Sequence, residues 1–140
     1  MKTHVLVATL VGGIFGFLMG WLVYGIALMD FYNANAIAYE GLMKAEPSYI
    51  AIFLSCVCWA WLFALVFDKW AGIRDFKSGM MSGMMITLPI VLSMDIYFYG
   101  TMNLWSDKLL VVDVIVGVVF NGIVAGVVGL LLGKLNKSQG

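Results

Sequence analysis

The chain has 140 residues, of which 63% are hydrophobic and 11% are charged, and its formal net charge is zero. A soluble domain carries roughly 25% charged residues, so this chain has too few charges to cover a surface that faces water. A net charge of zero also gives no bulk attraction to nucleic acid. The composition therefore indicates an integral membrane protein whose main partner is the lipid bilayer, and it predicts no nucleic-acid partner.

Four long apolar stretches follow one another along the chain. A helix crosses the hydrocarbon layer with about 20 mostly apolar residues, each rising about 1.5 Å. The stretches that qualify cover about 5–29, 49–67, 79–102 and 109–132. A strand of a membrane barrel needs only about 10 residues in an alternating pattern, and these stretches are longer and mostly continuous. The sequence predicts one transmembrane domain over 1–140, all-α, with four helices in an antiparallel bundle.

The connections between these stretches differ in kind. Segment 30–46 mixes aromatic and aliphatic residues with Asn and Glu, which is typical of a helix lying in the membrane interface. An extension of the first helix is the alternative. The connections 68–78 and 103–108 are short, and short connections join neighbouring antiparallel helices. We expect the second and third helices to form one hairpin, and the third and fourth another.

Lysine and arginine fall unevenly on the two sides of this predicted bundle. Six lie on the side of both termini, namely Lys2, Lys69, Arg74, Lys77, Lys134 and Lys137, against Lys44 and Lys108 on the other side. The positive-inside rule therefore predicts that both termini are cytoplasmic. We expect the membrane to be a bacterial inner membrane. Six of the eight acidic residues fall on the outer side. Ordinary topology signalling explains this excess, and an outward mouth that concentrates cations is the alternative.

Glycines spaced four residues apart recur in three of the predicted helices. They are Gly12, Gly16 and Gly20 in the first, Gly79 and Gly83 in the third, and Gly122 and Gly126 in the fourth. Small residues at this spacing form a flat groove that lets two helices approach closely. The grooves serve either packing within one chain or association between chains. With several such faces on four helices, we expect a homo-oligomer, with a dimer favoured.

Asp95 is the main candidate for a functional residue. It lies about 15 residues, or roughly 22 Å, into the third helix from Met80, which places it in the outer third of the membrane and below the headgroups. An intramembrane carboxylate costs about 2.5–3.5 kcal/mol and usually faces a cavity or a partner. Pro89 should kink the helix and free the carbonyl of Met85, and a freed carbonyl near a carboxylate suits an ion or proton site. A purely structural Asp95, protonated or bonded to a neighbour, is the alternative.

Three further polar residues accompany Asp95 as candidates for ion or proton binding. Asp113 lies near the start of the fourth helix, where it also complements the helix dipole. Asp30 ends the first helix at a similar height, so these two carboxylates and Asp95 could converge on one outer pocket. Asn121 lies mid-membrane, where an interhelical hydrogen bond is its ordinary role.

No catalytic signature is present in the sequence, so we predict no enzyme, no catalytic residue and no cofactor. His4 is the only histidine. The methionine-rich run around Met80 and Met84 invites a copper site because thioethers favour Cu(I). Methionine is also a common flexible core residue, and the histidine lies far away along the chain. We therefore predict no metal site.

Four features resemble a family of small bacterial four-span membrane proteins of unknown function. They are a glycine-rich first helix that closes on Trp21-Leu22-Val23-Tyr24-Gly25, a short basic inner loop, a third helix that opens with small residues, and Asn121 in a glycine-rich fourth helix. The family pattern has Trp-Tyr-Gly-Pro after the first helix, whereas here the tryptophan and tyrosine are separated and no proline follows. The resemblance implies a four-span fold and no activity, so it assigns no site residue.

The sequence favours a small membrane protein that binds or transports a cation or proton through an outward-facing acidic pocket centred on Asp95. One alternative is a scaffold or accessory subunit whose glycine faces contact another membrane protein. A third is a protein that binds a lipid or a hydrophobic small molecule through Trp59, Trp61 and the methionine face.

Overall fold

The computed structural model describes residues 2–137, and it is helical except for the connections. Its elements are α1 Thr3–Leu22, the π-helical turn η1 Val23–Ala27, α2 Met29–Asn35, α3 Tyr49–Val66, the π-helical turn η2 Phe67–Ala71, α4 Phe76–Thr101 and α5 Asp107–Lys137. Within these residues no strand forms. Four helical segments are long and apolar enough to cross a membrane, namely Thr3–Ala27, Tyr49–Ala71, Phe76–Thr101 and Asp107–Asn136. The prediction of an all-α protein with four membrane-spanning helices is confirmed at this level.

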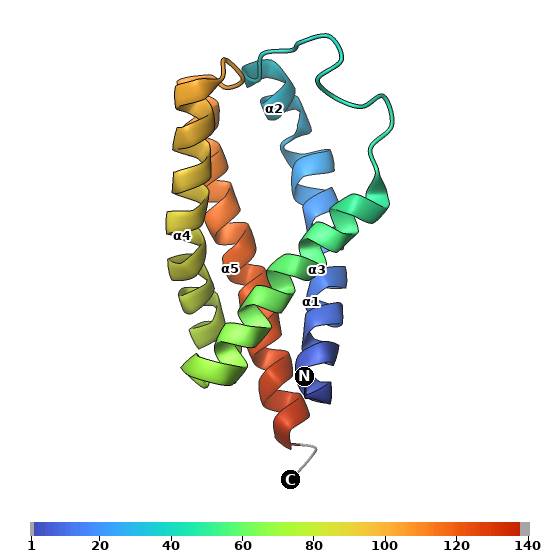
Figure 1. Cartoon of the computed structure of the whole chain (residues 1–140), viewed down its shortest axis with the longest axis vertical. Coiled ribbons are helices and arrows are strands. Elements are labelled where there is room, and N and C mark those ends of the chain that lie inside the picture. Colours follow the sequence, from blue (N-terminus) through green and yellow to red (C-terminus); the bar gives the residue numbers. More distant parts are fainter. Residues whose placement is uncertain (1, 138–140) are drawn as a thin grey trace.

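The four long helices converge at one end and spread apart at the other (Figure 1). The start of α1 and the end of α5 lie together at the bottom of the view, which we call the termini end. Helix α2 and the connection over residues 36–48 lie at the opposite end, which we call the loop end. Helices α4 and α5 run side by side, whereas α3 leans across α1 and α5.

The buried core is concentrated at the termini end. Its members come from the start of α1, the second half of α3 with η2, the connection before α4, and the last turns of α5: Val5, Ala8, Ala60, Phe63, Ala64, Phe67, Ile73, Ala125, Val128 and Leu132. The rings of Phe63 and Phe67 stack with their centroids 6.0 Å apart. Close packing therefore fixes the helices at this end and leaves the loop end more open.

The predicted glycine faces are occupied by helices of the same chain. A Cβ atom on Gly79 would lie 2.8 Å from the carbonyl oxygen of Ala125, and one on Gly12 would lie 2.6 Å from Val128. The other expected glycines also face neighbouring helices: Gly16 faces Val124, Gly20 faces Phe120, Gly83 faces Ala125, Gly122 faces Met84, and Gly126 faces Phe76. Packing within one chain uses these faces, so they no longer support the expected homo-oligomer.

The predicted hairpin between the second and third spanning helices is wrong. Helix α3 packs mainly on α1 and α5, and the main neighbour of α4 is α5. Gly13 on α1 lets Val57 of α3 approach closely, whereas the glycine face of α4 is filled by α5. At the end of η2, Gly72 adopts a left-handed conformation with φ of 62°, and the chain then turns away into α4. A short connection therefore joins two helices that diverge from it.

Segment 30–46 is helical only in its first part, and Leu28 separates that part from the first spanning helix. After η1, α2 is helical only to Asn35, and the chain then crosses to the connection between α4 and α5. The amide of Ile37 donates to the carbonyl of Leu104 at 2.9 Å, and the amide of Ser106 donates to the carbonyl of Asn35 at 3.2 Å. These bonds satisfy backbone groups that a continued helix would have paired internally. The segment therefore ties two connections together at the loop end.

Two helix boundaries also differ from the expected ones. Helix α4 begins three residues earlier than expected, because the carboxylate of Asp75 accepts a hydrogen bond from the amide of Ser78 at 2.9 Å and caps the helix. Helix α5 begins at Asp107 after Ser106, whose hydroxyl accepts from the amide of Leu109. The caps, rather than the apolar stretches, set where these helices start.

Candidate functional site

The carboxyl groups of Asp95, on α4, and Asp113, on α5, lie close enough to interact electrostatically. Asp95 lies six residues before the end of α4, and Asp113 lies six residues after the start of α5. At a rise of about 1.5 Å per residue, both are about 9 Å from the connection between the two helices. The tight packing of α4 against α5 therefore brings the two carboxyl groups together, as the sequence allowed.

Two tyrosines cover this carboxyl pair. The hydroxyl of Tyr32, on α2, donates a hydrogen bond to Oδ1 of Asp113. Burial and the bond to Asp113 both raise the pKa of the Tyr32 phenol above its ordinary value. The ring of Tyr24, on η1, packs edge to face against Tyr32 with the centroids 5.6 Å apart. Neither tyrosine was among the residues predicted for this site, so the roles of both were missed.

Asp95 is largely closed to its surroundings, whereas Asp113 is half-buried. Asp95 is only 5% exposed, and within residues 2–137 its Oδ2 atom is buried without a hydrogen-bond partner. A hydrogen bond between two carboxyl groups requires a proton on one of them. Two ionised carboxylates this close would also repel each other strongly in a medium of low dielectric constant. The geometry therefore suits a pair that holds one proton and has a free acceptor position beside it.

The third carboxylate of the predicted pocket lies apart. Asp30 is exposed in the first turn of α2. Among the described residues there is no group of three His, Cys, Asp or Glu that could hold a metal ion. The expected convergence of Asp30 with the other two carboxylates is therefore not observed, because α2 turns this side chain outward.

Asn121 and Pro89 also differ from expectation. The amide of Asn121 donates to the carbonyl of Gly117 at 3.0 Å within α5, so the expected interhelical hydrogen bond is not observed. Helix α4 continues through Pro89, which is exposed, and Met85, whose carbonyl it frees, is also exposed. Met85 and Pro89 therefore lie on the exposed side of α4, whereas Asp95 is buried.

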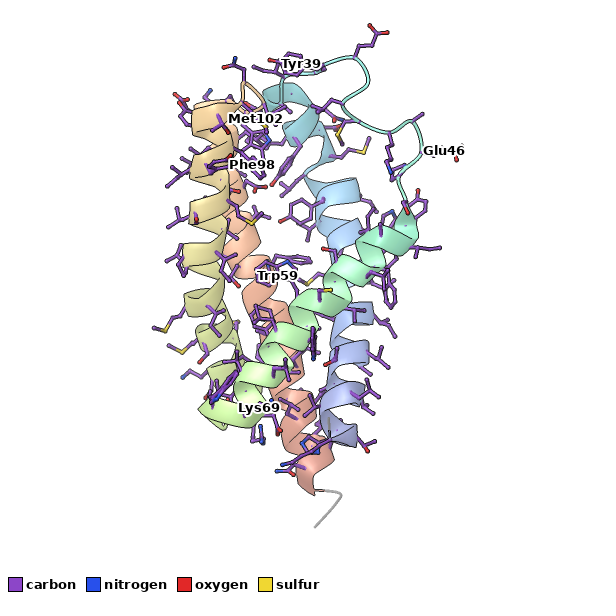
Figure 2. All side chains as sticks on the ribbon, viewed as in Figure 1. Tyr39, Glu46, Trp59, Lys69, Phe98 and Met102 are labelled. Carbon is purple, nitrogen blue, oxygen red and sulfur yellow. The ribbon has the colours of Figure 1, made fainter. Side chains whose placement is uncertain are left out.

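A second feature of the loop end is a pocket of about 620 Å³ between α1, α3 and α5, which we call the loop-end pocket. Its lining is mostly aromatic and aliphatic, and Asn121, Ser55 and Cys56 are its polar or polarisable members. The full lining consists of Phe17, Gly20, Trp21, Tyr24, Gly25, Met29, Pro47, Tyr49, Ile52, Ser55, Cys56, Trp59, Phe120 and Asn121. Figure 2 shows Trp59 at mid-height on α3, below the connection that carries Glu46. Tyr24 belongs to both features, because it lines the pocket and also packs against the tyrosine that covers the carboxyl pair.

Only part of the predicted hydrophobic site faces this pocket. Trp59 lines it, whereas Trp61 is 47% exposed and lies on the outward side of α3. Met81 and Met85 are likewise exposed on α4. Residues two apart on a helix point in different directions, so Trp59 and Trp61 cannot share one site.

A polar cluster at the termini end was missed from the sequence. Oδ1 of Asp68, in η2, lies 2.8 Å from Nη2 of Arg74 and 3.1 Å from Nε2 of His4. His4 and Asp68 are 64 residues apart. Only their similar depth could have indicated this contact from the sequence, since both lie near the ends of predicted helices on the side of the termini. The cluster joins the start of α1 to the end of the second spanning segment.

The comparisons with known proteins identify no relative. No family model matches the chain, and no curated protein and no solved structure matches it.

Proposed function

We propose that this protein binds a proton at the Asp95–Asp113 pair and passes it across the membrane. The observation that carries the proposal is a buried carboxyl group inside a spanning helix, with one oxygen unpartnered and a second carboxyl group near enough to interact with it electrostatically. Intramembrane carboxylates that face a partner are typical of proton relays. The phenols of Tyr24 and Tyr32 beside the pair are further groups through which a proton can move.

A proton fits this site better than a divalent metal ion. A calcium ion takes about six to eight oxygen ligands, and a magnesium ion demands near-ideal octahedral geometry. Two carboxyl groups and one phenol that already bonds Asp113 offer fewer ligands. The shared proton also relieves the repulsion between the two carboxyl groups, which explains how two acids are tolerated side by side in a lipid-embedded bundle.

We place the protein in a bacterial inner membrane as an antiparallel four-helix bundle, with both termini cytoplasmic. The support is the excess of lysine and arginine on the side of the termini. In this orientation the carboxyl pair lies in the outer half of the membrane, below the loop end. Protons would reach it from the outside past Tyr32.

Proton flux into proteoliposomes that contain a pH-sensitive dye tests the proposal. We expect wild-type protein to carry protons, and Asp95→Asn and Asp113→Asn to reduce the flux at least tenfold. Asp30→Asn is the matched control, because it removes an exposed carboxylate at the same end of the molecule. Equal flux in wild type and Asp95→Asn, or no flux in either, would refute the proposal.

The loop-end pocket supports a second candidate function, the binding of a hydrophobic molecule with one polar group. Its volume of about 620 Å³ falls within the roughly 300–1,000 Å³ of small-molecule sites. Its lining is aromatic, with Asn121 as a polar contact. These are the features of a pocket that binds an apolar body and orients a single polar group.

Extraction of bound molecules tests this second candidate. The variant Ser55→Trp places a large ring in the pocket, whereas Ser93→Trp adds the same ring at an exposed position on α4 outside it. We expect a hydrophobic molecule to co-purify with wild type and with Ser93→Trp, and to be lost from Ser55→Trp. Equal amounts in all three samples would reject the pocket as a binding site.

The scaffold alternative and the homo-oligomer are left without a supporting observation, because the glycine faces on which both rested are filled within the chain. Both stay predictions, and the mass of the purified protein in mild detergent decides between a monomer, a symmetric oligomer and a complex with another membrane protein.

A further inference from the structure

A second pocket lies at the termini end, on the opposite side of the membrane from the carboxyl pair. It has a volume of about 570 Å³ and is lined by Lys2, Val5, Leu65, Asp68 and Lys69. We call it the lysine pocket. The start of α1 supplies two of these residues, and the end of the second spanning segment supplies the other three. Figure 2 shows Lys69 near the bottom of the bundle, where α1 also begins in Figure 1.

The charge in the lysine pocket is positive. Asp68 is its only acidic lining residue, and Oδ1 of that carboxylate already binds Arg74 at 2.8 Å and contacts His4 at 3.1 Å. Arg74 therefore balances the charge of Asp68, and the charges of Lys2 and Lys69 are left over. Both lysines are exposed, and no ion pair is found for either within the described part of the chain. The pocket thus presents two uncompensated cations from two different helices.

Two neighbouring features match a group at the membrane surface. Lys2 is the N-cap of α1, and its side chain does not cap the helix, so the positive end of the helix dipole adds to the charge of the lysines. Trp70, next to Lys69, is 75% exposed, and exposed tryptophans mark the level of lipid headgroups. The pocket therefore lies where phosphate groups of the bilayer are found.

We propose that the lysine pocket binds the anionic phosphate headgroup of a membrane phospholipid. Lys2 and Lys69 contact the phosphate from opposite sides, and Val5 and Leu65 contact the upper part of an acyl chain. The apolar residues are the reason for naming a lipid rather than a soluble phosphate, which would have no use for them. Basic pockets between spanning helices on the cytoplasmic side bind anionic headgroups in this way.

Native mass spectrometry of the whole protein in mild detergent, with equal amounts of phosphatidylglycerol and phosphatidylcholine, tests the proposal. Each lysine near an anionic surface contributes about fivefold in binding. We expect wild type to prefer phosphatidylglycerol, and the double variant Lys2→Gln with Lys69→Gln to lose about tenfold or more of that preference. The control is Lys44→Gln with Lys108→Gln, which removes two exposed lysines from the loop end and should leave the preference unchanged.

A second variant keeps the charges and fills the pocket. Leu65→Trp should also reduce the preference for phosphatidylglycerol, although both lysines remain. An unchanged preference in the double variant, or an equal loss in the loop-end control, would overturn the proposal. Displacement of the lipid by inorganic phosphate at matched ionic strength would overturn the lipid assignment in favour of a soluble phosphate ester.

Discussion

The phenol of Tyr32 donates a hydrogen bond to the carboxylate of Asp113 and thereby ties α2 to α5, although the two residues are 81 positions apart. This bond holds the segment after the first spanning helix against the last one. The carboxyl pair is therefore assembled by three parts of the chain rather than by the α4–α5 hairpin alone.

Tyr32→Phe removes this hydrogen bond and keeps the ring. We expect the free energy of unfolding in detergent to fall by about 1 kcal/mol, because a hydrogen bond to a charged group is lost at a half-buried position. Hydrogen exchange of the amides in α2 should accelerate. Tyr97→Phe is the control, since Tyr97 is 63% exposed on α4. Equal effects of the two substitutions would contradict the importance of the bond to Asp113.

The cap at the start of α4 predicts a dependence of stability on pH. The hydrogen bond from the amide of Ser78 lowers the pKa of the Asp75 carboxyl. A lowered pKa in the folded state means that the stabilisation is fully present above the ordinary value of about 4 and is lost as the pH falls below it. We expect Asp75→Ala to lower the melting temperature at neutral pH, and to lower it less and less as the pH falls through the lowered pKa of this carboxyl.

Asp75→Ser is the matched variant for this measurement. Serine also caps helices but does not ionise in this range, so its melting temperature should stay near that of wild type at neutral pH. As the pH falls, the melting temperature of wild type should then decrease relative to that of the serine variant. A constant difference between them would show that the charge of Asp75 plays no part.

Gly79 and Gly100 lie on the same helix and provide a direct test of close packing. A Cβ atom on Gly79 would lie 2.8 Å from the carbonyl oxygen of Ala125 and 3.1 Å from the Cα of Gly126, whereas nothing lies within 4 Å of one on Gly100. We expect Gly79→Ala to lower the free energy of unfolding by about 1–3 kcal/mol, because backbone atoms cannot easily move aside. Gly100→Ala should be neutral or slightly stabilising, and thermal unfolding in detergent compares the two.

Arg74→Gln tests the polar cluster at the termini end. The side chain of Asp68 is only 8% exposed, so removal of Arg74 leaves a largely buried carboxylate without its cation. We expect a loss of about 2 kcal/mol, below the roughly 3–5 kcal/mol of a fully buried pair, because the side chain of Arg74 is 30% exposed. The double variant Asp68→Asn with Arg74→Gln should recover part of this loss. No recovery would mean that Arg74 stabilises the fold through other contacts, such as its bonds to the carbonyls of Phe67 and Ile73.

The four spanning helices were predictable because hydropathy and length are properties of single segments. The meeting of Asp95 and Asp113 was predictable in outline, since a short connection places residues at equal distances from it at equal heights. The position of α3 was not predictable in this way. It depends on which helix packs against which glycine face, and the sequence contains several glycine faces that are equally suited to close helix packing.

The clusters that join distant segments were the hardest to foresee. His4 and Asp68 come from two helices whose relative rotation no periodicity specifies. Tyr32 and the exposed Asp30 both lie on α2, which follows a π-helical turn that the hydropathy pattern did not indicate. The depth of a residue in the membrane could be predicted from the sequence. The direction in which its side chain points from the helix axis could not.

The spread of the helices at the loop end gives the molecule unequal cross-sections in the two leaflets of a bilayer (Figure 1). A wedge of this shape fits best where the leaflet around its wide end is expanded, so its free energy of insertion depends on membrane curvature. The loop-end pocket lies between the spread halves of α1 and α3. Lateral pressure in that leaflet therefore acts on the helices that form the pocket walls. The volume of the pocket then depends on how tightly the surrounding lipids pack.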